Sequence, residues 1–569
     1  MSNALGWAVG RATALAPSRR DLLAMGRAPR RDLIAGLTVG VVALPLALGF
    51  GISSGLGAEA GLVTAIVAGI VAALFGGSHL QISGPTGAMT VVLIPIVATY
   101  GRNGVLVVGI MAGLMLVAMA VAGLGGYVRY IPLPVIEGFT LGIAVIIALQ
   151  QVPSSLGVAG SGEQVLSVAR TAVEEWWHQP QWWAPGMTLS VIAVMWLTAR
   201  IRPGVPGSLV AVLLAAGVAE FLHLDIARIG ALPSGLAAPR LPDLSWVQLN
   251  DLLLPALAVA VLAALESLLS ASVADAMSVS ERHDPDRELL GQGLANLASP
   301  IFGGIPATAA IARTAVNVRS GASSRLSALV HSVFLLAVIV LLAPMVGRIP
   351  LAALAGILIA TAIRMVEVGS VRAMLRAGRG DAAVLIGTAV ATIALDLISA
   401  VVIGVVAAGA LALRQVARAS SLELRPVVES EHADHEAEEH ALLDEHIVAY
   451  RLEGSLFFAA AHRALLELST LSEIRVVILR LSRVATVDAT GASVLRDTIA
   501  QLEQRGITVL LSGVRDRHQG VLDALGVYSA LAHEGHLFDS TPKAIAHARL
   551  HVARTPHSAL GVGTGGEPG

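Results

Sequence analysis

Two stretches of glycine, proline and small residues interrupt the apolar part of this chain. The first is ISGPTGAMT, from Ile82 to Thr90, and the second is GGIPATAAIART, from Gly303 to Thr314. Each reads as the start of a short helix. Inside a membrane, such a start presents backbone amides and the positive end of the helix dipole, and two of them facing each other would attract an anion.

The residue types in these stretches favour anion binding. Thr86 can cap the first helix after Pro85, while small residues in the second stretch let an anion approach the backbone and Arg313 supplies a permanent positive charge. The alternative role for Arg313 is a structural salt bridge to Glu266. The predicted substrate-binding residues are Thr86, Gly87, Ala88, Met89, Ala310, Ile311, Ala312 and Arg313.

Glu266 stands in the otherwise apolar run from Leu254 to Leu269. A charged carboxylate is costly there, and a group that gains and loses a proton within an anion path is suited to coupling transport to protons. A permanent ion pair with Arg313 is the competing interpretation. We predict that Glu266 is the proton-coupling residue.

The composition indicates that these residues lie in a polytopic membrane protein. Of 569 residues, 55% are hydrophobic and 14% are charged, whereas a soluble chain carries about 25% charged residues. Apolar stretches predict fourteen segments, near 33–50, 57–76, 86–99, 104–124, 133–152, 185–200, 206–223, 251–277, 287–301, 309–318, 323–345, 351–367, 382–398 and 399–416.

The segments that begin near Thr86 and Ala309 are too short to cross about 30 Å of hydrocarbon. They are the third and the tenth of the fourteen, so they occupy corresponding places in two halves. This pattern is typical of an inverted-repeat transporter with its site near the midplane. Simple kinking of packed helices by proline and glycine is the alternative.

Several functional classes are disfavoured by what the sequence lacks. The net charge is −2 without a basic stripe, which gives no reason to expect nucleic-acid binding, and the absence of cysteine excludes disulfides. No Gly-x-x-x-x-Gly-Lys-Ser/Thr loop occurs, which disfavours a primary pump. No nucleophile–base pair or set of metal ligands converges, so we predict neither an enzyme nor a cofactor or metal.

The chain changes character after the last apolar segment. An acidic linker with several histidines covers 418–445, and we expect a solvated linker rather than a metal site there. Residues 446–552 predict a small α/β domain, with strands at 447–452, 476–481 and 508–511 and helices around 461–470 and 491–505. The tail, 553–569, is rich in Gly, Pro and Ser and is predicted to be disordered.

Within the small domain, Val487 to Ala492 joins a strand to a helix. Asp488 can cap that helix, and Gly491 would permit a tight entry. Thr490 is a candidate regulatory position, with a structural cap as the alternative.

These motifs resemble those of the SulP family of anion transporters, the sulfate permease family. Ile82 to Thr90 is similar to its third-helix motif, Ala264 to Ser270 to its eighth-helix motif, and Gly303 to Gly321 to its tenth-helix motif; Ile447 to about Leu550 resembles a STAS domain. The resemblance implies two inverted repeats of seven segments, a core domain that moves against a gate domain, and a homodimer.

The resemblance also bears on individual residues. It implies that Arg313 lies beside the anion, and that Thr490 lies near the serine that is phosphorylated in STAS-domain anti-sigma-factor antagonists. In the sodium-coupled bicarbonate members, the position of Glu266 is an aspartate that helps to hold sodium. Glutamate together with Arg313 is more similar to the proton-coupled members that move four-carbon dicarboxylates or sulfate.

We therefore expect a secondary active transporter of small anions: sulfate-like oxyanions, bicarbonate or four-carbon dicarboxylates, in symport with protons. An uncoupled exchanger or channel, a sodium-coupled bicarbonate transporter, and a membrane anion sensor signalling through the STAS domain are the alternatives. Arginines that precede the first segment place the N-terminal segment, 1–32, in the cytoplasm. The transport domain is predicted over 33–417, multi-pass in the inner membrane among lipid, with both termini cytoplasmic.

Overall fold

The computed structural model describes residues 17, 19–130, 132–159, 161, 165–202, 205–242, 246–278, 282–395, 400, 403–411, 446–456 and 474–554. These fall into two compact units. The first comprises residues 1–129, 137–367 and 387–403, and the second comprises residues 130–136, 368–386 and 404–569. The acidic linker, the helix predicted around 461–470 and nearly all of the predicted disordered tail lie outside the described residues.

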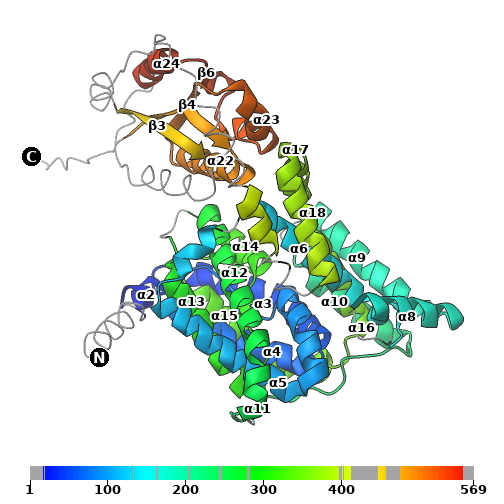
Figure 1. The fold of residues 1–569 in the computed structure, drawn as a ribbon. Coiled ribbons are helices and arrows are strands. Elements are labelled where there is room, and N and C mark those ends of the chain that lie inside the picture. The colour runs from blue at the N-terminus through cyan, green and yellow to red at the C-terminus, as the bar shows by residue number, and fades with distance from the viewer. Residues whose placement is uncertain are drawn as a thin grey trace, which may run out of the picture. The chain divides into compact units, whose positions relative to one another are not determined.

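The first unit is helical (Figure 1). Its helices are α2 (Arg19–Ala24), α3 (Pro29–Ser53), α4 (Ala58–Phe75), α5 (Gly87–Val121), α7 (Val152–Leu156), α8 (Val165–His178), α9 (Trp183–Ile201), α10 (Gly207–Phe221), α11 (Trp246–Asp251), α12 (Leu253–Met277), α13 (Pro285–Ile301), α14 (Ile311–Arg319), α15 (Leu326–Val346) and α16 (Leu351–Met365). The helices α6 (Leu133–Gln150) and α18 (Arg379–Ala394) run from one unit into the other, and the 3-10 helix η1 (Gly125–Tyr130) precedes α6.

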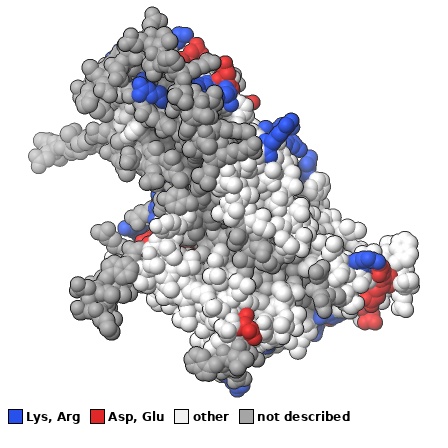
Figure 2. Space-filling model, in the orientation of Figure 1, with Lys and Arg blue, Asp and Glu red and all other residues white. Residues whose placement is uncertain are grey.

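The prediction of a polytopic helical membrane protein is confirmed. Among the described residues, eight helices are long and apolar enough to cross a membrane. A helix lies on each predicted segment, the last of them described at residue 400 and at 403–411. Over the helices of the first unit, charged side chains in the view of Figure 2 are sparse and gather near α8, where Arg170 and Glu174 form an ion pair.

Some boundaries differ from the prediction for identifiable reasons. The segments at 86–99 and 104–124 form one assigned helix, α5, which breaks at Gly101, where the backbone has φ 66° and ψ −166°. Positive φ is accessible to glycine without steric cost, so a break between two helices falls there. The amphipathic helices α8 and α17 (Val368–Ala377) were not predicted, because their charged faces do not resemble a membrane span.

Glycines allow the first two long helices to pack closely. A Cβ atom at Gly61 of α4 would overlap the carbonyl oxygen of Ala47 in α3, and one at Gly51 would lie 2.7 Å from the amide nitrogen of Gly61. Since lipid supplies no hydrophobic drive between helices, such close backbone approach is a main source of helix association in membranes.

The interrupted stretches meet as a short antiparallel pair. Strand β1 (Ser83–Gly84) pairs with β2 (Thr308–Ala309), with Ser83 opposite Ala309 and Gly84 opposite Thr308. Helix α5 starts three residues after β1 and α14 starts two residues after β2. The two helices therefore begin from one shared, buried junction, as a two-fold axis in the membrane plane would produce.

The second unit contains the small α/β domain, a confirmed prediction. Its parallel sheet has the order β3 (Ile447–Leu456), β4 (Val476–Val487), β5 (Thr508–Ser512) and β6 (Leu537–Phe538). Apolar side chains of α22 (Ala489–Gln504) and α23 (Asp516–Ala524) pack on one face, and those of α24 (Thr541–Arg554) pack on the other. The 3-10 helices η2 (Tyr528–Ala530) and η3 (Glu534–His536) connect α23 to β6.

Helix α17 belongs to this second unit. Its residue Ala373 packs against the apolar cluster that α22 and α23 form on the sheet. The compact unit is therefore larger than the predicted domain at 446–552, because it also takes in α17 and the first turn of α6.

Candidate functional site

Thr86 caps the start of helix α5, as the sequence predicts. Thr86 has an extended backbone, and its hydroxyl accepts a hydrogen bond from the amide of Met89 at 3.4 Å. Thr86, Gly87, Ala88 and Met89 are all buried, and the side chain of Met89 belongs to the main apolar core of the first unit. Any contact of this turn with a substrate must therefore come from its backbone or from the Thr86 hydroxyl.

Arg313 reaches from α14 to the residues that precede α5. Its side chain is 1% exposed, and Nη2 donates a hydrogen bond to the carbonyl oxygen of Pro85 at 2.5 Å. Gly84 has φ 153°, and a Cβ atom there would lie 2.7 Å from Nη1 of Arg313. Glycine is thus required for the guanidinium to lie against this backbone.

The other terminal nitrogen of the Arg313 guanidinium, Nη1, differs from Nη2 in its hydrogen bonding. Nη1 is buried and has no hydrogen-bond partner among the described residues. A buried guanidinium normally uses all its donors, since an unpaired one costs about 1–3 kcal/mol. The site therefore retains one donor nitrogen, with two N–H groups, on a permanent cation beside the start of both short helices.

Glu266 of α12 meets the same junction. The hydroxyl of Thr86 donates a hydrogen bond to Oε2 of Glu266 at 2.8 Å, and the next residue, Ser267, bonds both the hydroxyl of Thr308 and the amide of Ala309 at 3.1 Å. The carboxylate is partly exposed. Thr86 thus links the acid to the first turn of α5.

A salt bridge between Glu266 and Arg313, the competing interpretation for both residues, is not formed. Within the described part of the chain, no nitrogen of Arg313 lies within 4.0 Å of a Glu266 oxygen, although the two charges interact electrostatically. Each of them instead binds a group at the start of α5.

The two helix starts are not equally open. The first turn of α5 is buried, whereas Ile311 is 42% exposed, Ala312 is exposed and Ala310 is partly exposed. The sequence predicted that both helix starts would contribute to the anion site, but the core packs over the α5 end. The accessible side of the site is formed by α14.

A network of polar residues on α13 supports the junction and was not predicted. Glu288 is 2% exposed and accepts hydrogen bonds from the amides of Gly77 and Ser78 and from the side chains of Gln81 and Gln292. Gln292 also donates to the hydroxyl of Ser83 in β1 at 2.7 Å.

The same helix holds the second strand. Asn296 donates to the carbonyl oxygen of Ala307 and accepts from its amide, both at 2.8 Å. Glu288, Gln292 and Asn296 recur every four residues in a helix otherwise taken as a span, and that period is the signal that could have identified them.

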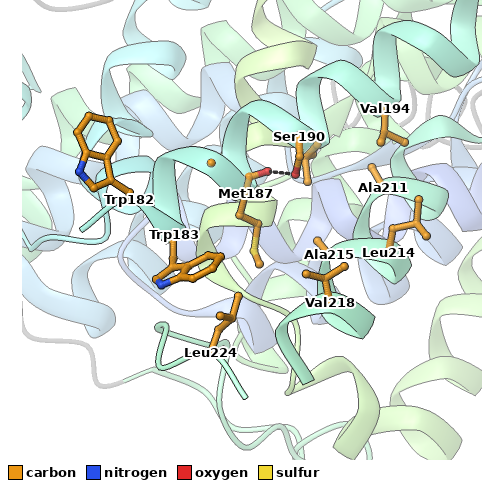
Figure 3. Close-up of a pocket in the computed structure, with 12 residues that line it drawn as sticks. Trp182, Trp183, Met187, Ser190, Val194, Ala211, Leu214, Ala215, Val218 and Leu224 are labelled. Carbon is orange, nitrogen blue, oxygen red and sulfur yellow. Dashed lines mark hydrogen bonds between the residues drawn. The ribbon is translucent and has the colours of Figure 1, made fainter. Parts of the chain in front are cut away.

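The cavity in Figure 3 is a separate feature. It measures about 560 Å³, lies between α9 and α10, and is lined mainly by apolar side chains such as Met187, Leu214 and Val218. The hydroxyl of Ser190 already donates to the carbonyl oxygen of Met187 at 2.8 Å. Because none of its described lining residues is charged, this cavity is unsuited to an anion.

In the second unit, Thr490 takes part in an unexpected contact. Asp488 caps α22 by accepting from the amide of Gly491 at 2.6 Å, as predicted, although Gly491 lies within the helix without a positive φ. The hydroxyl of Thr490 accepts a hydrogen bond from the amide of Leu133, the first residue of α6, at 3.0 Å.

Comparison with known proteins agrees with these features. Residues 30–388 match the model of the sulfate permease family, and residues 441–544 match that of the STAS domain. The "Putative sulfate transporter YvdB" of Bacillus subtilis is 36% identical over 90% of this chain and 96% of its own length. The bicarbonate transporter BicA of Synechocystis is 33% identical over 92% of this chain and 95% of its own length.

Solved structures show the same fold. The transmembrane domain of a cyanobacterial bicarbonate transporter BicA, 35% identical, covers 66% of this chain and 98% of its own with a TM-score of 0.61. The murine anion transporter Slc26a9, in its inward-facing state, covers 91% of each chain with a TM-score of 0.62 at 16% identity.

Proposed function

The chain belongs to the sulfate permease family and is a multi-pass anion transporter with a STAS domain, and we propose that it moves a small anion together with protons. The observation that carries this proposal is the position of Glu266. A titratable carboxylate shares the capping residue of α5 with the candidate anion site, at 2.8 Å from the Thr86 hydroxyl.

Coupling follows from this shared contact. An anion at the start of α14 would face Arg313 and lie near Glu266, and two negative charges repel each other in a medium of low dielectric. Anion binding is therefore favoured when Glu266 is protonated, and protonation is favoured when the anion is bound. If both events bias the same alternation between the two sides of the membrane, a proton gradient drives uptake.

Sulfate, bicarbonate and four-carbon dicarboxylates all suit this site, because helix termini and one arginine recognise charge more strongly than shape. Relatives named as sulfate and as bicarbonate transporters support the first two. Sodium-coupled bicarbonate transport is the second candidate, and the similarity to the bicarbonate transporter BicA over nearly the whole chain favours bicarbonate as its substrate. We further propose a homodimer in the inner membrane, with both termini in the cytoplasm.

The test is uptake into proteoliposomes of sulfate, bicarbonate, fumarate and succinate, each with and without an inward proton gradient and with and without sodium. We expect accumulation of at least one anion when only a pH difference is applied. Accumulation that follows sodium and ignores pH would replace the proposal by the second candidate. Equal flux in every condition would indicate an uncoupled exchanger or channel.

The variant Glu266→Gln tests whether proton coupling depends on this residue. The amide keeps the shape but cannot take up a proton, so proton-driven accumulation should fall at least about tenfold while exchange of anion at equal pH persists. Glu59→Gln, a carboxylate in the first turn of α4, is the matched control and should behave like the wild type. If Glu266→Gln still concentrates anion under a pH gradient alone, coupling through Glu266 is wrong.

A further inference from the structure

Four histidines gather at one edge of the STAS domain. His533 and His536 lie in the segment that leads through η3 into β6, and His547 and His551 lie on α24. The imidazole of His536 is central: its ring centroid is 5.7 Å from that of His533, 5.5 Å from that of His547 and 6.0 Å from that of His551. The rings of His547 and His551 are 6.4 Å apart.

The fold fixes the positions of two of these histidines on α24. His547 and His551 are four residues apart, so they lie on one face of α24, and that spacing on a helix is the one by which two imidazoles bind the same metal ion. Ala544, Ile545 and Ala548 fix the helix to the sheet through the neighbouring face. Phe538 of β6 lies 5.2 Å from the ring of His547, which limits the movement of that side chain.

His536 lacks the partner that a buried imidazole normally has. The residue is 4% exposed, and its Nδ1 has no hydrogen-bond partner among the described residues. An unsatisfied buried polar atom costs about 1–3 kcal/mol, and buried exceptions require an explanation such as an ion. Burial and the neighbouring histidines lower the pKa of His536 to about 4, which keeps this imidazole neutral, the form that ligates metals.

We propose that His536, His547 and His551, with His533 as a fourth donor, bind one divalent transition-metal ion of the Zn²⁺ class at this edge of the STAS domain. In a tetrahedral site with metal–nitrogen bonds of about 2.0–2.1 Å, two ligating imidazole rings have centroids about 5 Å apart. Among the described residues no three such groups already converge at ligand distance, so the proposal requires the imidazole rings to move closer together when the ion binds.

The charges nearby permit a cation. Lys543 lies one turn before His547 on α24, where an unpaired ammonium would repel a metal ion. Its Nζ instead pairs with the carboxylate of Asp539 at 3.3 Å. Imidazole donors without a thiolate suit Zn²⁺, Ni²⁺, Co²⁺ and Cu²⁺ rather than Ca²⁺ or Mg²⁺, which require oxygen ligands.

Such an ion would join the segment before β6 to α24, which covers the sheet. By mass action, an ion that binds only the folded domain stabilises it and reduces local opening of these two elements. The proposed function does not depend on this site, because the four histidines lie in the second unit and the anion site lies in the first.

The test uses the full-length protein without an affinity tag, in detergent and stripped of metal by a chelator. Zn²⁺ is titrated in competition with a chromophoric chelator, and Co²⁺ is added separately to record its visible absorption. We expect one Zn²⁺ per chain with a dissociation constant of about 1 μM or below, and a Co²⁺ spectrum typical of tetrahedral coordination.

Two double variants locate the ion. His547→Gln with His551→Gln should weaken Zn²⁺ binding at least about tenfold, whereas His432→Gln with His435→Gln, in the acidic linker, should leave it unchanged. In the wild type, Zn²⁺ should also slow amide hydrogen exchange in β6 and α24, a measurement that requires no variant. Equal binding by the wild type and the α24 variant, loss of binding in the linker variant, or unchanged exchange would each overturn the proposal.

Discussion

At the scale of single residues, the two terminal nitrogens of Arg313 differ in their hydrogen bonding. One nitrogen binds the Pro85 carbonyl, which fixes the guanidinium, and the other is left without a partner among the described residues. A fixed cation with a free donor loses little side-chain entropy when an anion arrives. This geometry favours the substrate role over the salt bridge with Glu266.

Arg313→Ala should therefore weaken anion binding by at least about tenfold, since a charge-assisted hydrogen bond contributes about 1.5–3 kcal/mol. The measurement is calorimetric titration of the purified protein with the anion identified in the uptake panel. Arg319→Ala, on the exposed last turn of the same helix, is the matched control. An affinity equal to the wild type in Arg313→Ala would contradict the assignment.

The sequence identified Thr86, Glu266 and Arg313, because polar residues in an apolar setting are conspicuous. It could not reveal that Thr86 and Glu266 are in contact, since the two residues are 180 positions apart. It also missed Glu288, which accepts from backbone amides of the loop before β1, and Gln292, which donates to the hydroxyl of Ser83 in β1. Such demands are set by tertiary structure rather than by local pattern.

At the scale of elements, helix positions were predictable from apolar length and from the Gly/Pro interruptions, while helix contacts were not. The α3–α4 contact depends on which glycines face each other. Gly61 and Gly217 are both helical glycines, yet only the first is in close contact, and a Cβ atom at Gly217 would meet nothing within 4 Å.

We expect opposite effects from alanine at these two positions. Gly61→Ala forces α3 and α4 apart and should lower the free energy of unfolding by about 1–3 kcal/mol, as overpacking does. Gly217→Ala removes backbone freedom from the unfolded chain and should be neutral or stabilising by up to about 1 kcal/mol. Thermal unfolding in detergent, followed by circular dichroism, compares them. Equal melting temperatures for the two variants would show that the contact does not limit packing.

The edge of the STAS domain should be sensitive to acid. The pKa of His536 is lowered to about 4 from 6.5 by burial and by its neighbours His547, His551 and His533, so the unfolded form binds more protons in that range. The contribution of His536 to stability is then present above pH 6.5 and is lost as the pH falls toward about 4.

Amide exchange in α24 of the full-length, metal-free protein provides the measurement. After correction for the intrinsic pH dependence of exchange, protection should decrease between about pH 6.5 and 4.5 in the wild type and less in His536→Gln, which has no imidazole to protonate. The ion pair between Lys543 of α24 and Asp539, which precedes that helix, is exposed to solvent and should contribute little. A wild-type profile that does not change with pH would contradict the buried neutral state of His536.

At the scale of the whole molecule, the composition break predicted a membrane part followed by a small α/β domain, and the matches to the sulfate permease family and to the STAS domain confirm these two parts. The two compact units of the structure do not coincide with the predicted domain boundaries. The first turn of α6 and helix α17 belong to the same compact unit as the STAS domain. The first turn of α6 is as apolar as a membrane span and α17 is amphipathic, and neither pattern assigns a segment to the second unit.

The hydrogen bond of Thr490 allows a test of whether the start of α6 depends on the STAS domain. Its hydroxyl accepts the hydrogen bond of the Leu133 amide, one of the donors that a helix N-terminus leaves unsatisfied. Thr490→Ala removes the acceptor, and a hydrogen bond of about 1 kcal/mol corresponds to about fivefold faster amide exchange in the first turn of α6. Thr490→Ser keeps the hydroxyl and should retain protection. Anion affinity should be the same in all three proteins, because the anion site lies in the other unit.

The transport rate then decides whether the contact is regulatory. If the STAS domain acts on transport through the start of α6, Thr490→Ala should change the rate of uptake at saturating anion by up to about fivefold, and Thr490→Ser should not. Faster exchange at Leu133 with an unchanged rate would limit Thr490 to a capping role. Unchanged exchange in Thr490→Ala would mean that the hydrogen bond does not hold α6, and the regulatory role of Thr490 would lose its structural basis.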